Sequence, residues 1–363
     1  MKKLLIIFAL ACMLCGNAFA TELPDEQADL AGTDSLVQEL PSDVQNALSD
    51  ISPTESTDFW GKFKSIFFDA LGGSDGALKS GLALCASLLG IMMLCAIVNV
   101  QPTKDITGAT NIAGALAICA ACIASFHSTI NLAMDMVRSL TDYSTFLLPA
   151  MASATAMSGG LTSASALYAG TVLFSNILMQ LISKLLLPVI YFYLAVATAE
   201  AAMANDMLTQ LREFIGWLIS KSLRIILYIF TAYMTLTGVI SGTADATSVR
   251  TMKAAVSTMV PVVGSILSDS SDTLLAGAAL LKNSIGIFGM IAVIALCITP
   301  FLRVGIQYIL LKTTSAVSGI VGMKSHVSLM KNFSAAMGYL LGMCGACVLM
   351  LLISMVCFLR VVV

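Results

Sequence analysis

Long uninterrupted apolar runs dominate the chain from residue 77 to its end, and short polar stretches separate them. A helix that crosses a bilayer needs about 20 apolar residues. The runs that meet this length predict about eight membrane-spanning helices, at residues 77–98, 106–126, 162–183, 185–202, 222–241, 277–299, 301–319 and 333–359. The pattern therefore predicts an all-α fold, a polytopic bundle of membrane helices.

Two further apolar segments, at residues 146–159 and 256–268, are too short to cross a bilayer. One contains Pro149 and the other contains Pro261. Backbone that does not span is tolerated at membrane depth only where protein or water satisfies its polar groups. We expect either surface helices or re-entrant half-helices here. Their matching positions in the chain favour re-entrance, which makes both prolines candidate pore residues.

The prolines also suggest an internal repeat. Pro149 and Pro188 are separated by the same number of residues as Pro261 and Pro300. When the first pair is laid on the second, the Val-Arg dipeptide that precedes each pair also aligns.

The repeat would cover residues 106–202 in its first copy and about 221–319 in its second, with the final span at 333–359. Each copy contains three of the predicted spans. Because an odd number of crossings reverses the direction of the next unit, we expect an inverted-topology repeat.

The N-terminal segment resembles a secretory signal. Lys2 and Lys3 precede an apolar stretch, and Ala18-Phe19-Ala20 forms a small-x-small cleavage site. Residues 1–20 are therefore predicted to be a cleaved signal peptide, which places the mature N-terminus outside the cytoplasm.

Residues 21–75 form an acidic extracytoplasmic leader that holds more than half of the acidic residues of the chain. Its apolar residues follow a helical period over 57–71, with an aromatic stripe that includes Phe59, Phe63 and Phe67. We expect this amphipathic helix either to lie at the membrane interface or to pack on a partner. The transmembrane domain would then occupy residues 76–363.

Composition supports an integral membrane protein. Hydrophobic residues make up 58% of the chain and charged residues 11%, with a mean hydropathy of +0.92. Soluble proteins average roughly 45–50% apolar and about 25% charged residues. There is no basic stripe for nucleic acid and no GxxxxGK[ST], HExxH or GxSxG motif, so neither an enzyme nor a nucleic-acid-binding protein is expected. No cofactor is expected. The CxxC pairs lie within apolar runs, which favours packing over metal binding.

Lys282 and Lys312 lie deep within apolar runs, where an ionisable group carries a functional hypothesis. Asp269 and Asp272 precede the run that contains Lys282. Two interpretations remain open: the acidic loop folds back to pair with Lys282, or Ser271 or Asp272 caps a helix that begins at the next residue. The candidate pore or structural residues are thus Pro149, Pro261, Asp269, Asp272, Lys282 and Lys312.

The whole layout, and most specifically residues 261–286 (PVVGSILSDSSDTLLAGAALLKNSIG) followed by 297–303, resembles the stage III sporulation protein AE family of endospore-forming bacteria. The resemblance implies a membrane component of a secretion-like transenvelope channel complex between mother cell and forespore. Such a protein would lie in the mother-cell membrane surrounding the forespore. Its implied partners are other stage III sporulation proteins, including ring-forming proteins and a cytoplasmic ATPase. The alternatives are a self-sufficient secondary transporter with inverted repeats and a passive membrane scaffold.

Overall fold

The structure is a computed structural model. It describes residues 59–99, 104–203, 205–259, 264–321 and 324–361, together with short pieces of the leader at 36–37, 40–41, 44–45 and 48. The predicted signal peptide at residues 1–20 lies outside the described residues, as does most of the acidic leader.

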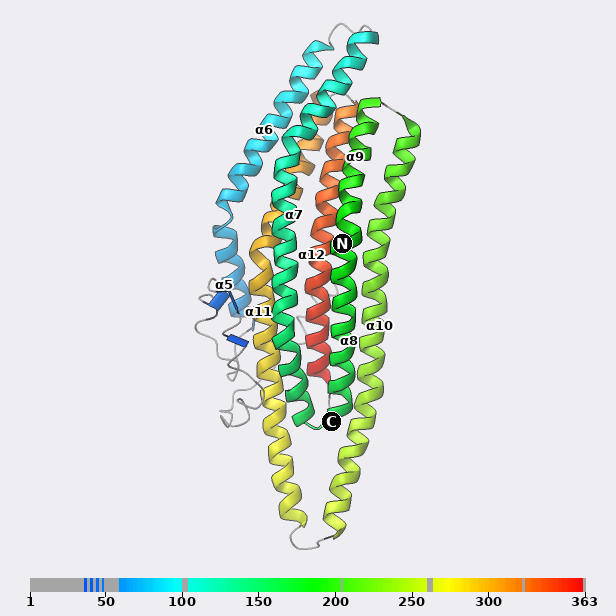
Figure 1. The fold of residues 1–363 in the computed structure, drawn as a ribbon. Helices are drawn as coiled ribbons and strands as arrows, with labels where there is room; N and C mark the ends of the chain where they lie inside the picture. The colour runs from blue at the N-terminus through cyan, green and yellow to red at the C-terminus, as the bar shows by residue number, and fades with distance from the viewer. Residues whose placement is uncertain are drawn as a thin grey trace.

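The described part of the chain is helical, without strands. Its elements are α5 (Phe59–Gly72), α6 (Asp75–Val98), α7 (Lys104–Met157), α8 (Leu161–Gln180), the π-helical turn η1 (Leu181–Leu186), α9 (Leu187–Met203), α10 (Asp206–Met259), α11 (Gly264–Val321) and α12 (Lys324–Arg360). Figure 1 shows these helices as an elongated bundle in which successive long helices alternate in direction.

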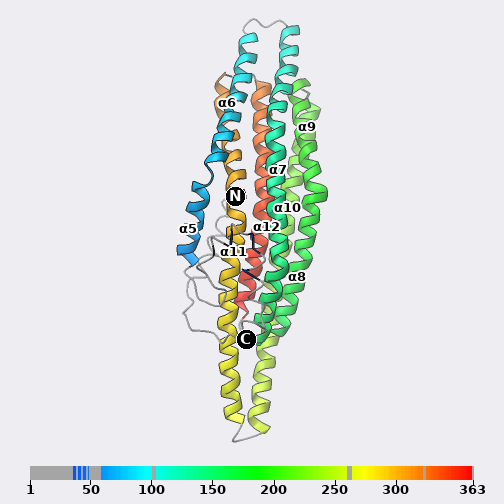
Figure 2. The ribbon, with the colours of Figure 1, turned by 60° about the vertical axis from the view of Figure 1, so that its left-hand side comes forward.

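Helices α11 and α12 form the centre of the bundle. In the most apolar stretch of each helix, 72% of α11 and 67% of α12 is buried, against 22% of α6 and 17% of α10. Close approach is possible because small residues line α11: a Cβ at Gly289 would lie 2.5 Å from Leu147 Cδ1 of α7. Figure 2 shows α5 and α6 along one flank, where both contact α11. The outer faces of α6 and α10 are thus available to lipid or to a partner.

The amphipathic helix predicted at 57–71 is present as α5. Its side chains Phe59, Ile66 and Ala70 are buried, and the helix contacts α11. The rings of Phe59 and Phe63 stack with centroids 6.3 Å apart, while Phe68 is exposed. One side of the helix therefore packs on protein.

The structure does not confirm the prediction of eight spans. Within the described residues, six helices are long and apolar enough to cross a membrane. The predicted spans 162–183 and 185–202 join into one continuous rod through η1. The predicted spans 277–299 and 301–319 are both part of α11, which passes through Pro300 without ending.

The π-helical turn explains why Pro188 does not end its helix. A proline ring inside an α-helix clashes with the carbonyl four residues earlier, which here belongs to Lys184. In η1 the N–H of Leu187 donates to the carbonyl of Ile182, five residues earlier. This wider turn lies immediately before Pro188 and makes room for the ring.

The predicted re-entrant segments are not separate half-helices. Residues 146–157 are the last turns of α7, which continues through Pro149 to Met157. The segment at 256–268 includes the end of α10 and the start of α11, and Pro261 between them lies outside the described residues. Pro149 thus lies within a continuous helix, and the structure does not confirm re-entrance at 146–159.

The structure does not confirm the inverted relation between the two predicted copies either. Each copy contributes two long helices, α7 with α8–α9 and α10 with α11. Figure 1 shows that both hairpins turn at the same end of the bundle. An even number of helices per copy leaves the second hairpin running in the same direction as the first.

Several helices are longer than a bilayer is thick. Helices α7 and α10 have 54 residues each and α11 has 58. At 1.5 Å per residue a 54-residue helix extends about 80 Å, whereas the hydrocarbon core measures about 30 Å. Only part of each long helix can therefore lie in the membrane.

Candidate functional site

Lys282 has a structural partner in the core. Its side chain on α11 is only 5% exposed, and its Nζ donates a hydrogen bond of 2.6 Å to the backbone carbonyl of Val361. Val361 directly follows the last residue of α12, where the helical carbonyls lack intrahelical donors. A lysine at such an end supplies both a donor and a favourable charge. Lys282 thus fixes the C-terminal end of α12 against α11.

Lys312 lies in a different environment. It is exposed, its Nζ is 3.2 Å from the Tyr308 hydroxyl, and it lies 5.4 Å from the centroid of that ring. The contact is local to α11, one turn apart. Because α11 is one continuous helix, the thirty residues between Lys282 and Lys312 separate them by about 45 Å. The two lysines therefore do not form one site.

Asp269 and Asp272 lie in the first turns of α11. The helix already begins at Gly264, so the predicted cap at Ser271 or Asp272 is wrong. The side chains of both aspartates lie outside the part of the chain that the structure describes. Of the candidate residues whose side chains the structure describes, Pro149 lies on α7, and Lys282 and Lys312 lie far apart on α11.

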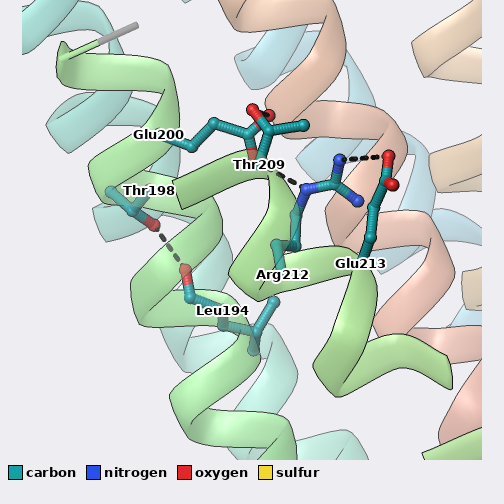
Figure 3. A network of polar contacts seen from close by, with 6 residues as sticks. All are labelled: Leu194, Thr198, Glu200, Thr209, Arg212 and Glu213. Carbon is teal, nitrogen blue, oxygen red and sulfur yellow. Dashed lines mark hydrogen bonds and ion pairs between the residues drawn. The ribbon is translucent and has the colours of Figure 1, made fainter. Parts of the chain in front are cut away.

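A polar network connects the end of α9 to the start of α10 (Figure 3). Arg212 Nε is 2.6 Å from Glu200 Oε2, and the Thr209 hydroxyl donates to Glu200 Oε1 at 3.0 Å. Both charged side chains are largely buried, with 15% and 13% exposed. Glu213 adds a weaker, exposed contact to Arg212 at 3.6 Å. The network holds the two helices at their connecting turn. In the sequence, the signal for this network is a pair of opposite charges on either side of the turn. The hydropathy pattern alone does not identify these charges.

Asp245 forms a second contact that the sequence pattern does not predict. Its two carboxylate oxygens accept hydrogen bonds from the backbone N–H groups of Thr162 (2.9 Å) and Ser163 (2.8 Å). These residues begin α8, whose own cap residue, Gly160, has no side chain. A carboxylate from α10 thus performs the capping that a local Ser or Asp usually provides. No local pattern signals this contact, because the partners are 83 residues apart.

Neutral polar groups join other helices in the same way. Gln307 of α11 donates to Ser125 of α7 at 2.7 Å, and the hydroxyls of Thr171 and Ser354 lie 2.9 Å apart between α8 and α12. The cysteines of the described residues are free thiols, mostly buried among apolar side chains. In that same part of the chain, no three His, Cys, Asp or Glu residues are grouped to hold a metal ion.

The fold and these contacts define a polytopic, all-helical membrane protein whose buried polar groups connect its helices. The chain belongs to the stage III sporulation protein AE family, whose model matches residues 49–361. It is similar to the stage III sporulation protein AE of Bacillus subtilis (strain 168), with 27% identity over 180 residues. That match covers 50% of this chain and 45% of the relative, so the chain matches about half the length of the relative. No solved structure matches.

Proposed function

We propose that this chain is the polytopic membrane subunit of a channel complex between mother cell and forespore that is required for sporulation. The observation that carries the proposal is the family match over residues 49–361, which includes every long helix of the bundle. In this proposal the protein lies in the mother-cell membrane around the forespore. It works with ring-forming proteins and a cytoplasmic ATPase of the same complex.

The distribution of basic residues supports an orientation with the N-terminus outside the cytoplasm. One end of the bundle is formed by the starts of α7, α10 and α12, and near it lie Lys104, Arg212, Lys221, Arg224, Lys312, Lys324 and Lys331. Near the opposite end lie Arg138, Arg250, Lys253 and Arg360. Cytoplasmic ends of membrane helices are enriched in Lys and Arg. The first end would then face the cytoplasm, and the predicted signal peptide agrees with that orientation.

The observed contact of Lys282 gives the transporter alternative no support. That hypothesis is a secondary transporter with inverted repeats, with Lys282 and the loop of Asp269 and Asp272 near its site. Lys282 instead donates to a backbone carbonyl at the end of α12.

Deletion of the gene in its host tests the proposal. We expect the number of heat-resistant spores to fall by orders of magnitude, with engulfed forespores that fail to develop further. A wild-type copy should restore them. Normal numbers of heat-resistant spores in the deletion strain would contradict the proposal.

Purification of the tagged full-length protein from sporulating cells tests the partner part. We expect ring-forming membrane proteins and an ATPase to copurify in mild detergent, and a control membrane protein of the mother cell not to. Solute transport by the protein alone in liposomes would favour the transporter instead.

A further inference from the structure

A cavity of about 350 Å³ lies on the surface near the N-terminal end of α10. Arg212, Gly216, Ser220 and Arg224 line it at intervals of four residues, which places them on one face of the helix over successive turns. Tyr339 of α12 forms the opposite wall. The cavity is therefore a groove along α10, bordered by the central helix of the bundle.

At the end of the groove that is farther from the start of α10, the positive charge is not balanced by carboxylates. Arg212 is already neutralised by Glu200 and Glu213. Lys221 and Arg224, one turn apart, are both exposed, and neither forms an ion pair with any described residue. Two neighbouring cations without a carboxylate provide a site for an anion.

Neutral donors complete the groove. The Ser220 side chain lines it, and the Tyr339 hydroxyl is brought against α10 because residue 216 is a glycine: a Cβ there would lie 2.5 Å from that oxygen. The Tyr339 ring is held by an edge contact with Tyr193, with centroids 5.5 Å apart and planes at 82°. Fixed hydroxyl donors beside two cations suit the several oxygens of a phosphate group.

The groove lies where lipid phosphates are expected. Residues 225–241 contain no charged residue, and at 1.5 Å per residue they extend about 25 Å, close to the thickness of the hydrocarbon core. Lys221 and Arg224 immediately precede this run. Trp217 and Tyr228 nearby are 55% and 68% exposed, as in the aromatic belts of membrane interfaces. Below the cations, Ile225 and Ile229 are exposed and can contact acyl chains.

We propose that this groove binds an anionic phospholipid, with Lys221 and Arg224 holding its phosphate and the exposed apolar face of α10 holding its acyl chains. The exposed apolar residues directly below the cations favour a lipid over a soluble phosphate compound or an acidic peptide. The inference does not depend on the sporulation role, because lipid binding is measured on the purified protein.

Tryptophan fluorescence provides a direct test, since the chain has two tryptophans and Trp217 lines the groove. In full-length protein carrying Trp60→Phe, Trp217 is the remaining reporter. The protein is reconstituted in phosphatidylcholine vesicles that contain either brominated phosphatidylglycerol or brominated phosphatidylcholine at the same mole fraction. We expect stronger quenching by phosphatidylglycerol, with an association preference on the order of tenfold.

Removal of the two charges should abolish that preference. In the variant with Lys221→Gln and Arg224→Gln we expect equal quenching by the two lipids. The exchange of Lys221→Arg with Arg224→Lys should keep the preference. Lys312→Gln is the matched control, because this exposed lysine lies outside the groove. Each variant is first checked for an unchanged melting temperature.

Three results would overturn the proposal. The first is equal quenching by both lipids in the unaltered groove. The second is a preference that survives in the doubly substituted variant. The third is displacement of phosphatidylglycerol by a large excess of inorganic phosphate or of an acidic peptide, which would assign the groove to a soluble anion or to a protein segment.

Discussion

At the scale of single residues, two buried charged side chains of the described residues bind backbone groups of other helices. Lys282 binds the carbonyl of Val361, and Asp245 binds the N–H groups of Thr162 and Ser163. Hydrogen bonds to charged groups contribute about 1.5–3 kcal/mol each, and loss of one partner leaves the other buried and unsatisfied. Such contacts fix the ends of helices that would otherwise fray.

Substitution of Lys282 should therefore destabilise the bundle. We expect Lys282→Met to lower the free energy of unfolding by about 1–3 kcal/mol, because the Val361 carbonyl loses its donor. Lys312→Met is the control and should change it by less than about 0.5 kcal/mol. Thermal unfolding in detergent measures both. Equal melting temperatures for the two variants would show that the contact to Val361 contributes nothing.

The Asp245 cap gives a second prediction. Asp245→Ala removes both acceptors at the start of α8, with an expected loss of about 1–2 kcal/mol. Hydrogen exchange of the Thr162 and Ser163 amides should become faster. Asp135→Ala is the control, since Asp135 is 70% exposed and 3.7 Å from Arg138. Unchanged exchange at both amides in the Asp245 variant would refute the capping role.

At the scale of elements, the sequence predicted helix positions well where a helix is about as long as a bilayer is thick. The predicted span at 77–98 is α6 (Asp75–Val98), and the amphipathic helix predicted at 57–71 is α5. The sequence did not predict the ends of a helix where the helix continues beyond its apolar run. For α10 the apolar run at 222–241 is less than half of the helix, whose flanking turns are polar.

Two breaks were predicted where none exists, and both involve a proline. Hydropathy measures transfer into lipid, whereas helix continuity depends on backbone hydrogen bonds. The wider turn of η1 removes the conflict at Pro188, and α11 continues through Pro300. The contacts of the candidate residues could not be predicted for a related reason. The sequence identified Lys282 as unusual, but its partner is 79 residues away and no local spacing connects them.

At the scale of the whole molecule, an arrangement with six long helices and one with eight short spans predict different sides of the membrane for the same residues. If α8, η1 and α9 cross once, Ser165 near the start of α8 and Met207 near the start of α10 lie on opposite sides of the membrane. With two crossings there, both would lie on the same side. The structure places Met207 and Lys324 at one end, because α10 and α12 both begin there.

Labelling of single cysteines distinguishes the two arrangements. In a background without the ten native cysteines, we expect a membrane-impermeant maleimide to label Ser165→Cys from one side only, and Met207→Cys and Lys324→Cys from the other. Labelling of the first two positions from the same side would restore two separate spans at 162–202.

The π-helical turn at Leu181–Leu186 also has a consequence for how relatives should be aligned. A π-turn amounts to one extra residue within an α-helix, and one residue corresponds to a rotation of about 100°. The faces of α8 and α9 are therefore out of phase by that angle in the sequence, although they belong to one rod. A relative with a straight helix here should align with a single-residue gap within 181–186, and without that gap every position after it would be matched to one about 100° away around the helix.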